Sequence, residues 1–157
     1  MTILQQEIRY AVYPKNPLTL VGKPTVGDGV YKGECAAIAQ FLVPGLGNSH
    51  VAQWRRGEKV QGNSRLLPGT VIAIFDCNGR YIGTRKHVHS GGLAHAALYV
   101  RQSPVGIDVV HQFTSSPVIR GTLIRFHGSK KEGHKSGVSA SGKTPEDSAE
   151  NYCVVEL

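Results

Sequence analysis

The sequence is short of cysteine and aromatic residues, and it contains no long hydrophobic run. Three cysteines occur in 157 residues, at positions 35, 77 and 153, which is too few for a disulfide-rich scaffold. No apolar stretch reaches the ~18 residues that a membrane-spanning helix needs. The first residues, MTILQQEIRYAVYPKNP, lack the basic patch and long apolar core of a secretory signal. We therefore expect no membrane insertion, and either a cytoplasmic location or export by a route other than general secretion.

Acidic residues are also in deficit. Eleven Asp and Glu face 18 Lys and Arg, which gives a net charge of +7 and a pI near 9.5. This balance favours an anionic partner, and nucleic acid, teichoic acid, acidic lipid and the carboxylate-rich cell wall all qualify. Proteins that bind single-stranded nucleic acid interleave aromatic and basic residues on a strand face. Here the cations gather in loops such as TRKH and GSKKEGHK, so a nucleic-acid-binding module is the weaker alternative.

The first third of the chain predicts a leader followed by helix. The length favours one domain, residues 1–157, with a core of its own. Prolines and glycines punctuate residues 1–33, which predicts an extended leader with little regular structure. Residues 34–43, ECAAIAQFLV, predict a helix with Glu34 in its first turn. A second short helix is predicted over residues 49–54, with Ser49 as its N-cap.

The remainder predicts short strands. Residues 66–76 contain a Pro-Gly turn and then a β-branched run, which indicates a buried strand. Asn78-Gly79 predicts a hairpin with a type I′ turn. Residues 128–151 are almost devoid of apolar side chains and predict a mobile polar loop. The expected fold is α+β, with one or two helices on a small antiparallel sheet, and its further strands are predicted at 95–100, 107–113, 117–126 and, at the sheet edge, 152–157.

Cys35, at the start of the first predicted helix, is a core residue, half of a disulfide, a metal ligand or a nucleophile. Helical spacing places Cys35, Ile38 and Leu42 on one buried face, so the thiol is expected to point toward the sheet. The first turn of a helix also favours an anion and lowers the pKa of a thiol. A nucleophile further needs a base on the facing sheet.

Two histidines qualify as that base and its partner. If the hairpin after residue 100 turns about Ser103, Tyr99 pairs with Ile107 and His95 with His111, and both imidazoles share one face. A slip of one residue replaces His111 by Gln112. We prefer His111 as the residue that orients His95, with Gln112 as the alternative. The residues alone leave a catalytic role and a structural role equally open, because a lone thiol is commonly a buried small hydrophobe.

A metal site is the other reading of the histidines. His87, His89 and His95 occur close together, but neither a Cys-x-x-Cys nor a His-Glu-x-x-His pattern accompanies them. We therefore expect no metal and no cofactor. The segment before His95 is expected to be a solvated loop that flexes at Gly91-Gly92.

Several segments together carry a resemblance to a known family. They are GECAAIAQF around Cys35, WRRGEKV from Trp54, GNSRLLPGTVIAIFD and NGRY between residues 62 and 81, and HAALYV from His95. Their order resembles the papain-like amidase fold of NlpC-type cell-wall peptidases, and more narrowly the second family of type VI secretion amidase effectors. The resemblance covers roughly residues 30–126.

This resemblance implies a monomeric antibacterial toxin that type VI secretion delivers from the producer cytoplasm into the periplasm of Gram-negative neighbours. It implies hydrolysis of peptidoglycan crosslinks between D-alanine and meso-diaminopimelate, and an immunity protein in the producer. A housekeeping or phage wall hydrolase with the same chemistry is the alternative. Such hydrolases usually carry an export signal or a wall-binding module, and neither is visible here.

The resemblance also implies roles for individual residues. Cys35 is the nucleophile, His95 the general base and His111 the orienting residue, although relatives often place a different polar residue at this third position. Tyr31 is a candidate donor to the oxyanion. Cys77 and Cys153 form either a disulfide or two buried free thiols, and the resemblance favours the disulfide. In the chain-entropy treatment such a bridge stabilises the fold by about 4 kcal/mol, and it forms only in an oxidising compartment.

Overall fold

A computed structural model of the chain describes residues 11–29, 32–46, 51–76, 78–81, 95–127 and 148–157. Within these ranges six strands form one antiparallel sheet in the order β1-β6-β2-β3-β4-β5. The predicted α+β class is confirmed. The elements are η1 (Pro17–Leu20), α2 (Ala37–Leu42), η3 (Val51–Gln53), β1 (Arg55–Lys59), β2 (Val71–Ile74), β3 (Ala96–Gln102), β4 (Gly106–His111), β5 (Arg120–Arg125), η6 (Ala149–Asn151) and β6 (Tyr152–Glu156).

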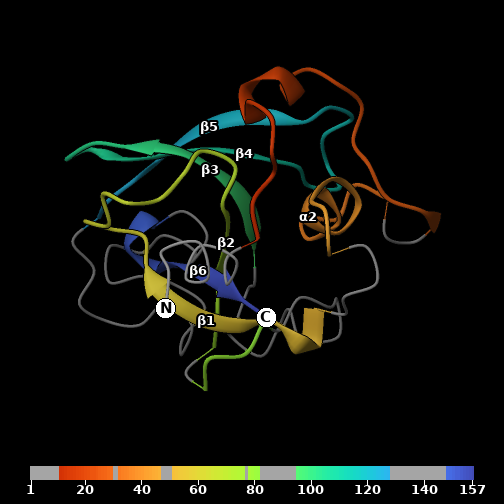
Figure 1. Cartoon of the computed structure of the whole chain (residues 1–157). Coiled ribbons are helices and arrows are strands. Elements are labelled where there is room, and N and C mark those ends of the chain that lie inside the picture. The colour runs from red at the N-terminus through yellow and green to blue at the C-terminus, as the bar shows by residue number, and fades with distance from the viewer. Residues whose placement is uncertain (1–10, 30–31, 47–50, 77, 82–94, 128–147) are drawn as a thin grey trace.

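The sheet is strongly twisted. β3, β4 and β5 lie in the upper part of Figure 1, β1 and β6 lie in the lower part, and β2 joins the two, with α2 to one side. All four residues of β2 are buried, because apolar clusters cover both faces of the sheet. Ile38 and Ala39 of α2 belong to the cluster that contains Leu98 and Val110. The opposite face is covered by a cluster that contains Ala97, Tyr99, Val109, Tyr152 and Val154.

Strand β1 has no hydrophobic pattern, and sequence analysis did not predict it. Its residues are RRGEK, and four of the five are exposed. Charged side chains are typical of an edge strand, since they discourage pairing with another chain. β1 pairs with β6, so the prediction that the C-terminal strand lies at the sheet edge is wrong: β6 lies between β1 and β2.

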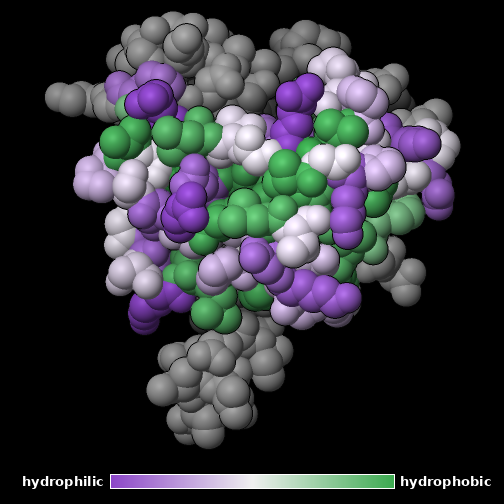
Figure 2. Space-filling view, turned by 90° about the horizontal axis from the view of Figure 1, so that it is seen from above, coloured by the Kyte–Doolittle hydropathy of each residue, from purple (hydrophilic) through white to green (hydrophobic). Residues whose placement is uncertain are grey.

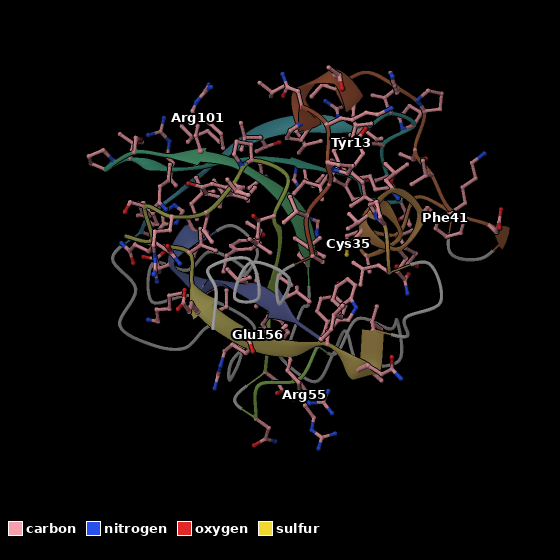
Figure 3. The ribbon with its side chains drawn as sticks, in the orientation of Figure 1. Tyr13, Cys35, Phe41, Arg55, Arg101 and Glu156 are labelled. Carbon is pink, nitrogen blue, oxygen red and sulfur yellow. The ribbon has the colours of Figure 1, made fainter. Side chains whose placement is uncertain are left out.

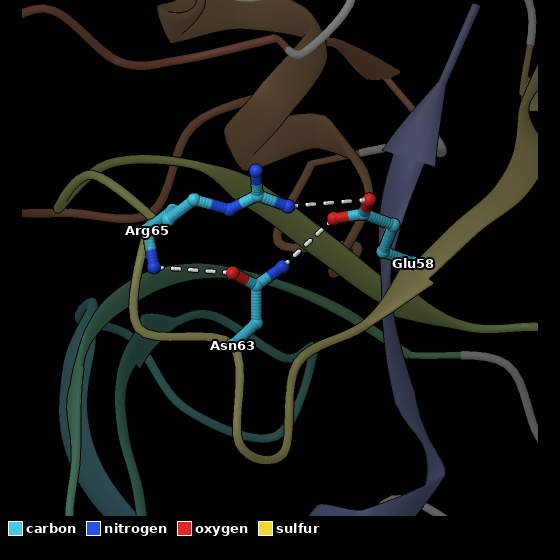
Figure 4. Close-up of polar contacts among 3 residues, drawn as sticks. All are labelled: Glu58, Asn63 and Arg65. Carbon is cyan, nitrogen blue, oxygen red and sulfur yellow. Dashed lines mark hydrogen bonds and ion pairs between the residues drawn. The ribbon is translucent and has the colours of Figure 1, made fainter.

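The turn after β1 is closed by polar contacts that Figure 4 draws. Asn63 Nδ2 donates to Glu58 Oε2 at 2.9 Å, and the backbone N–H of Arg65 donates to Asn63 Oδ1 at 3.1 Å. Arg65 also forms an ion pair with Glu58 at 3.7 Å. Both charged side chains are largely exposed, so the pair contributes little to stability, and it serves mainly to shape the turn.

The described part of the predicted leader has little regular structure, yet it is docked on the sheet. Val71 N–H donates to Ala11 C=O at 2.9 Å, and Tyr13 N–H donates to Gly69 C=O at 2.8 Å. Gly69 has a φ of +95°, and a Cβ there would lie 2.3 Å from the Tyr13 carbonyl oxygen. Only glycine therefore allows this close approach of two backbones. Figure 2 views the molecule from above relative to Figure 1. On the face turned toward the viewer, apolar side chains lie in the centre and polar ones lie around them.

Two predicted turns and loops differ from the structure. Gly79 N–H donates to Asp76 C=O at 3.0 Å, and Gly79 has a φ of +76°. A type I′ turn also needs a positive φ at Asn78, and no described non-glycine residue has one, so the predicted turn type is wrong. The predicted mobile loop, 128–151, ends too late, because Ser148 and Ala149 are fully buried and η6 begins at Ala149.

The predicted second helix is a single 3-10 turn, η3, and its predicted N-cap, Ser49, lies outside the described residues. No helix in the described part of the chain is long and apolar enough to cross a membrane.

Candidate active site

Cys35 lies in the turn that leads into α2 rather than in the helix. α2 begins at Ala37, so the prediction that the helix begins at residue 34 is wrong, and Glu34 is not in its first turn. The chain reaches Cys35 through Gly33, whose φ is +81°. Cys35 is partly exposed, whereas the next residues, Ala36 to Ala39, are buried against the sheet. In Figure 3, Cys35 lies between α2 and the sheet.

Gln112 binds the segment of chain that leads into α2. Its side chain is fully buried, and its Nε2 donates to the carbonyl oxygens of Val26 at 2.9 Å and Glu34 at 2.8 Å. Its Oε1 accepts from the N–H of Val26 at 2.9 Å. The carbonyl of Glu34 is thus bound by a side chain at the entrance to the helix. The alternative prediction, that Gln112 orients His95, does not match this position: Gln112 instead holds the segment that carries Cys35.

His95 and His111 lie together, as predicted. His95 Nε2 is 2.7 Å from His111 Nδ1, and the two rings meet edge to face with centroids 5.0 Å apart. Both histidines are buried. His111 Nε2 is in turn 2.8 Å from Thr122 Oγ1 on β5.

The register that brings the histidines together differs from the predicted one. Tyr99 pairs with Val109, not with Ile107, and the register shifts between Tyr99 and Arg101. The predicted pairing is therefore wrong by two residues at this point. A shift by an even number of residues leaves every side chain on its original face, which is why His95 and His111 still meet.

Helix α2 covers one face of β3. It packs with Ala96 and Leu98, whereas Ala97 and Tyr99 belong to the other cluster. His95 precedes the first residue of β3. The thiol and the imidazole therefore meet beyond the end of the strand, and not across a face of the sheet.

The Cys35 sulfur lies among hydrogen-bond donors. Tyr81 Oη is 3.4 Å from it, and it also interacts with the His95 side chain and the backbone N–H of Ala96. Burial raises the pKa of the Cys35 thiol, but the charge of His95 and the three hydrogen bonds outweigh burial, so that the pKa lies below its ordinary value. This environment favours a thiolate beside an imidazolium.

His111 is suited to accept a hydrogen bond from a charged His95. Burial, the charge of His95 and the charge of Arg120 lower the pKa of His111 to about 3, so His111 is neutral at neutral pH. A neutral imidazole has one N–H. If Nε2–H donates to Thr122 Oγ1, His111 Nδ1 is free to accept from His95 Nε2–H. The second nitrogen of His95, Nδ1, is then available to the thiol.

One groove among the described residues lies elsewhere. Its volume is about 650 Å³, and it is lined by the leader around Tyr13, by Leu67 and Pro68, and by Val100 and Arg101 at the far end of β3. Five residues of extended chain, roughly 17 Å, separate His95 from Val100. The groove therefore belongs to another part of the surface than the thiol and the histidines.

Other predicted residues fall outside the described part of the chain. They are Tyr31, Cys77, His87, His89, Gly91 and Gly92. Cys153 is a buried thiol on β6, and its disulfide with Cys77 stays a prediction. Among the described residues no group of three or more His, Cys, Asp or Glu side chains could hold a metal ion.

Sequence analysis missed Tyr81 and Thr122. Thr122 pairs with Val109 in the β4–β5 ladder, so it lies on the same face as His111 and one diagonal step away. Knowledge of the register between β4 and β5 would have placed Thr122 beside His111. Tyr81 had no comparable signal, because it approaches Cys35 only through the packing of the turn after β2.

Comparison with known proteins identifies the family of the chain. The domesticated amidase effector 2 family matches residues 2–138. A solved structure of a type VI secretion amidase effector 2 superposes with a TM-score of 0.69 at 30% identity, and the match covers 93% of this chain and 94% of that one. A search of the curated proteins found no match.

The fold is therefore the papain-like α+β fold of an amidase effector. The chain belongs to the domesticated amidase effector 2 family, and the resemblance to the second family of type VI secretion amidase effectors is confirmed.

Proposed function

We propose that this amidase effector is a cysteine amidase that hydrolyses the peptide crosslinks of peptidoglycan. Cys35 is the nucleophile, His95 the general base and His111 the residue that orients His95. The observation that carries this proposal is the continuous series Cys35–His95–His111, in which the thiol interacts with His95 and His95 Nε2 lies 2.7 Å from His111 Nδ1.

The reaction follows from thiol chemistry. His95 removes the proton of Cys35, and the thiolate forms a C–S bond to the amide carbonyl, which gives a tetrahedral oxyanion. His95 then gives that proton to the leaving nitrogen as the C–N bond breaks. Water attacks the thioester with His95 as base, the C–S bond breaks, and the carboxylic acid leaves. The backbone N–H of Cys35 and one further donor, for which Tyr31 is the candidate, stabilise the oxyanion.

The substrate bond is proposed to be D-alanine to meso-diaminopimelate. The net charge of +7 suits a polymer rich in free carboxylates. We further propose that the chain acts as a monomer in the periplasm of the target cell, and that an immunity protein protects the producer. Membership of an effector family favours this role over that of a housekeeping or phage wall hydrolase.

The test uses purified muropeptide dimers with a D-alanine–diaminopimelate crosslink. We expect the wild type to convert dimers to monomers, and Cys35→Ala to leave them intact. Cys153→Ala is the matched control, because it removes a buried thiol on β6 away from the histidines, and it should retain activity. Dimers joined through two diaminopimelates test the specificity. Intact D-alanine-linked dimers with folded wild type would contradict the proposal, and cleavage of both dimers would contradict only the proposed bond.

The biological role has a separate test. Expression with a periplasmic signal peptide should lyse a Gram-negative host, whereas expression without one should not. Cys35→Ala should be harmless in both forms. Equal toxicity in the cytoplasm would contradict action on the wall.

A further inference from the structure

The turn after β2 places an aromatic side chain against the reactive sulfur. Tyr81 follows Arg80, whose backbone forms a bridge with Arg55 of β1. The Tyr81 ring packs on Trp54, with centroids 5.0 Å apart, and meets Phe75 edge to face at 6.2 Å. Trp54 is fully buried and Tyr81 is 5% exposed. Packing on two sides therefore fixes the ring and, with it, the direction of its hydroxyl.

That hydroxyl lies 3.4 Å from Cys35 Sγ, within hydrogen-bond range for sulfur. Burial, followed by the charges of Cys35, Tyr152 and Glu34, raises the pKa of Tyr81 well above 10. Tyr81 therefore keeps its proton at any pH at which His95 can act as a base. Since a thiolate has no proton to donate, Tyr81 is necessarily the donor once Cys35 is ionised.

We propose that Tyr81 is a further catalytic residue, whose hydroxyl donates a hydrogen bond to the Cys35 thiolate and aims the sulfur at the substrate. This inference deepens the proposed function and rests on it. Three donors then surround the sulfur: the Tyr81 hydroxyl, the His95 ring and the backbone N–H of Ala96. The phenol comes from a segment of the chain that carries none of the other proposed catalytic groups.

The contribution of Tyr81 should depend on pH in a characteristic way. The hydrogen bond stabilises negative charge on sulfur, and this charge leaves the sulfur during attack on a carbonyl. A lower thiol pKa by one unit gives tenfold more thiolate at acidic pH, but each thiolate becomes roughly threefold less nucleophilic. Loss of the hydroxyl should therefore lower the reaction rate of Cys35 at low pH. Once the thiol is fully ionised, the rate should be unchanged or slightly higher.

The experiment is a pH titration of thiol reactivity in the full chain, which requires no peptidoglycan. The background is the double variant Cys77→Ala/Cys153→Ala, which leaves Cys35 as the one thiol of the chain, so that iodoacetamide alkylation, followed by mass spectrometry of the Cys35 peptide, reports on one site. Tyr81→Phe keeps the ring that packs on Trp54 and Phe75 and removes only the hydroxyl. Tyr99→Phe is the matched control, because Tyr99 is equally buried and its hydroxyl contacts Gln102.

We expect Tyr81→Phe to shift the midpoint of alkylation upward by about one pH unit. At a pH below the midpoint, alkylation should be several-fold slower than in the background protein, and above it equal or up to about threefold faster. Tyr99→Phe should leave the curve unchanged. An unchanged midpoint in folded Tyr81→Phe would overturn the proposal.

A second variant guards against misfolding of the first. Genetic incorporation of 3,5-difluorotyrosine at position 81 preserves the shape of the ring and makes the hydroxyl a stronger donor, so the midpoint should move downward. A shift upward or no shift would contradict the role of the hydroxyl. If the wild type itself shows an ordinary thiol midpoint, the activated thiolate of the proposed function fails as well. A lowered wild-type midpoint that neither variant changes refutes Tyr81 alone.

Discussion

Thr122 Oγ1 lies 2.8 Å from His111 Nε2, which makes a threonine on β5 the outer end of the hydrogen-bonded series that begins at Cys35. When the Nε2–H of His111 donates to this hydroxyl, Nδ1 of His111 is left to accept from His95. The orientation of the proposed base, which precedes β3, thus depends on a residue of β5, two strands away in the sheet.

Removal of the Thr122 hydroxyl should reduce the rate and not substrate binding. Because Thr122 is exposed, water can replace it in part, and we expect Thr122→Val to lower kcat by about 3- to 10-fold. Thr122→Ser retains the hydroxyl and should restore most of the rate. Steady-state kinetics on muropeptide dimers provides the measurement, and an equal loss in the serine variant would show that the threonine acts through packing.

Substitution of His111 should reduce kcat more than substitution of Thr122. A buried hydrogen bond to a charged group contributes about 1.5–3 kcal/mol, so His111→Ala should lower kcat about 10- to 100-fold. His111→Asn, which can still accept through its side-chain oxygen, should lose less. A fully active His111→Ala protein would mean that His95 needs no partner.

Acid stability follows from the pKa of His111. Burial, His95 and Arg120 lower its pKa in the folded protein to about 3 from an ordinary 6.5. Between these values the unfolded chain binds a proton that the folded protein does not. The free energy of unfolding should therefore fall as the pH drops from 6.5 toward 3, by at most about 1.4 kcal/mol per pH unit. Above pH 6.5 the contribution is complete.

Urea denaturation at several pH values measures this slope. In His111→Asn the slope over the same interval should be smaller, because the titrating group is gone. Identical slopes in the two proteins would show that other groups govern acid unfolding.

Two amide side chains, the buried Gln112 and the partly buried Gln102, allow a separation of stability from activity. Gln112 binds Val26 and Glu34 through three hydrogen bonds. Gln102 binds the chain at Val60, Gly62 and Asn63 in the same manner. Leucine at either position leaves backbone groups without partners, and each variant should lose about 2–4 kcal/mol of stability.

Only Gln112→Leu should change the chemistry of Cys35, because only Gln112 holds the turn before α2. We expect slower alkylation of Cys35 in that variant under conditions in which both proteins are folded. Equal alkylation rates in the two variants would show that the turn keeps its shape without Gln112.

Sequence patterns predicted the buried strands well, and other elements poorly. VIAI and the alternating residues of β3 and β4 carry their own hydrophobic signal. RRGEK carries no such signal, because its side chains are mostly exposed. It is a strand only because its backbone pairs with β6, about 100 residues further along the chain. Glu34 and Ala36 have good helix propensity and Cys35 does not, and α2 begins only at Ala37, after the turn in which Gln112 binds the Glu34 carbonyl.

Sequence analysis predicted the contact between two site residues that lie on one hairpin. It missed the residues that lie elsewhere in the chain. His95 and His111 belong to neighbouring strands, so alternation alone placed them on one face despite the wrong register. Tyr81 reaches Cys35 across 46 positions, and no local pattern reports such a contact. A prediction of Thr122 would have required the register of β4 with β5. The alternation of residues within a single strand does not contain that information.

The arrangement of β5 has a consequence for how the protein becomes active. The residues of the series that begins at Cys35, together with Tyr81, come from five separate stretches of chain, and the outermost of them, Thr122, joins only when β5 docks on β4. A partly assembled chain therefore holds its thiol without the arrangement that ionises it. The proposed catalytic arrangement therefore exists only in the complete tertiary structure, and an unfolded chain lacks it.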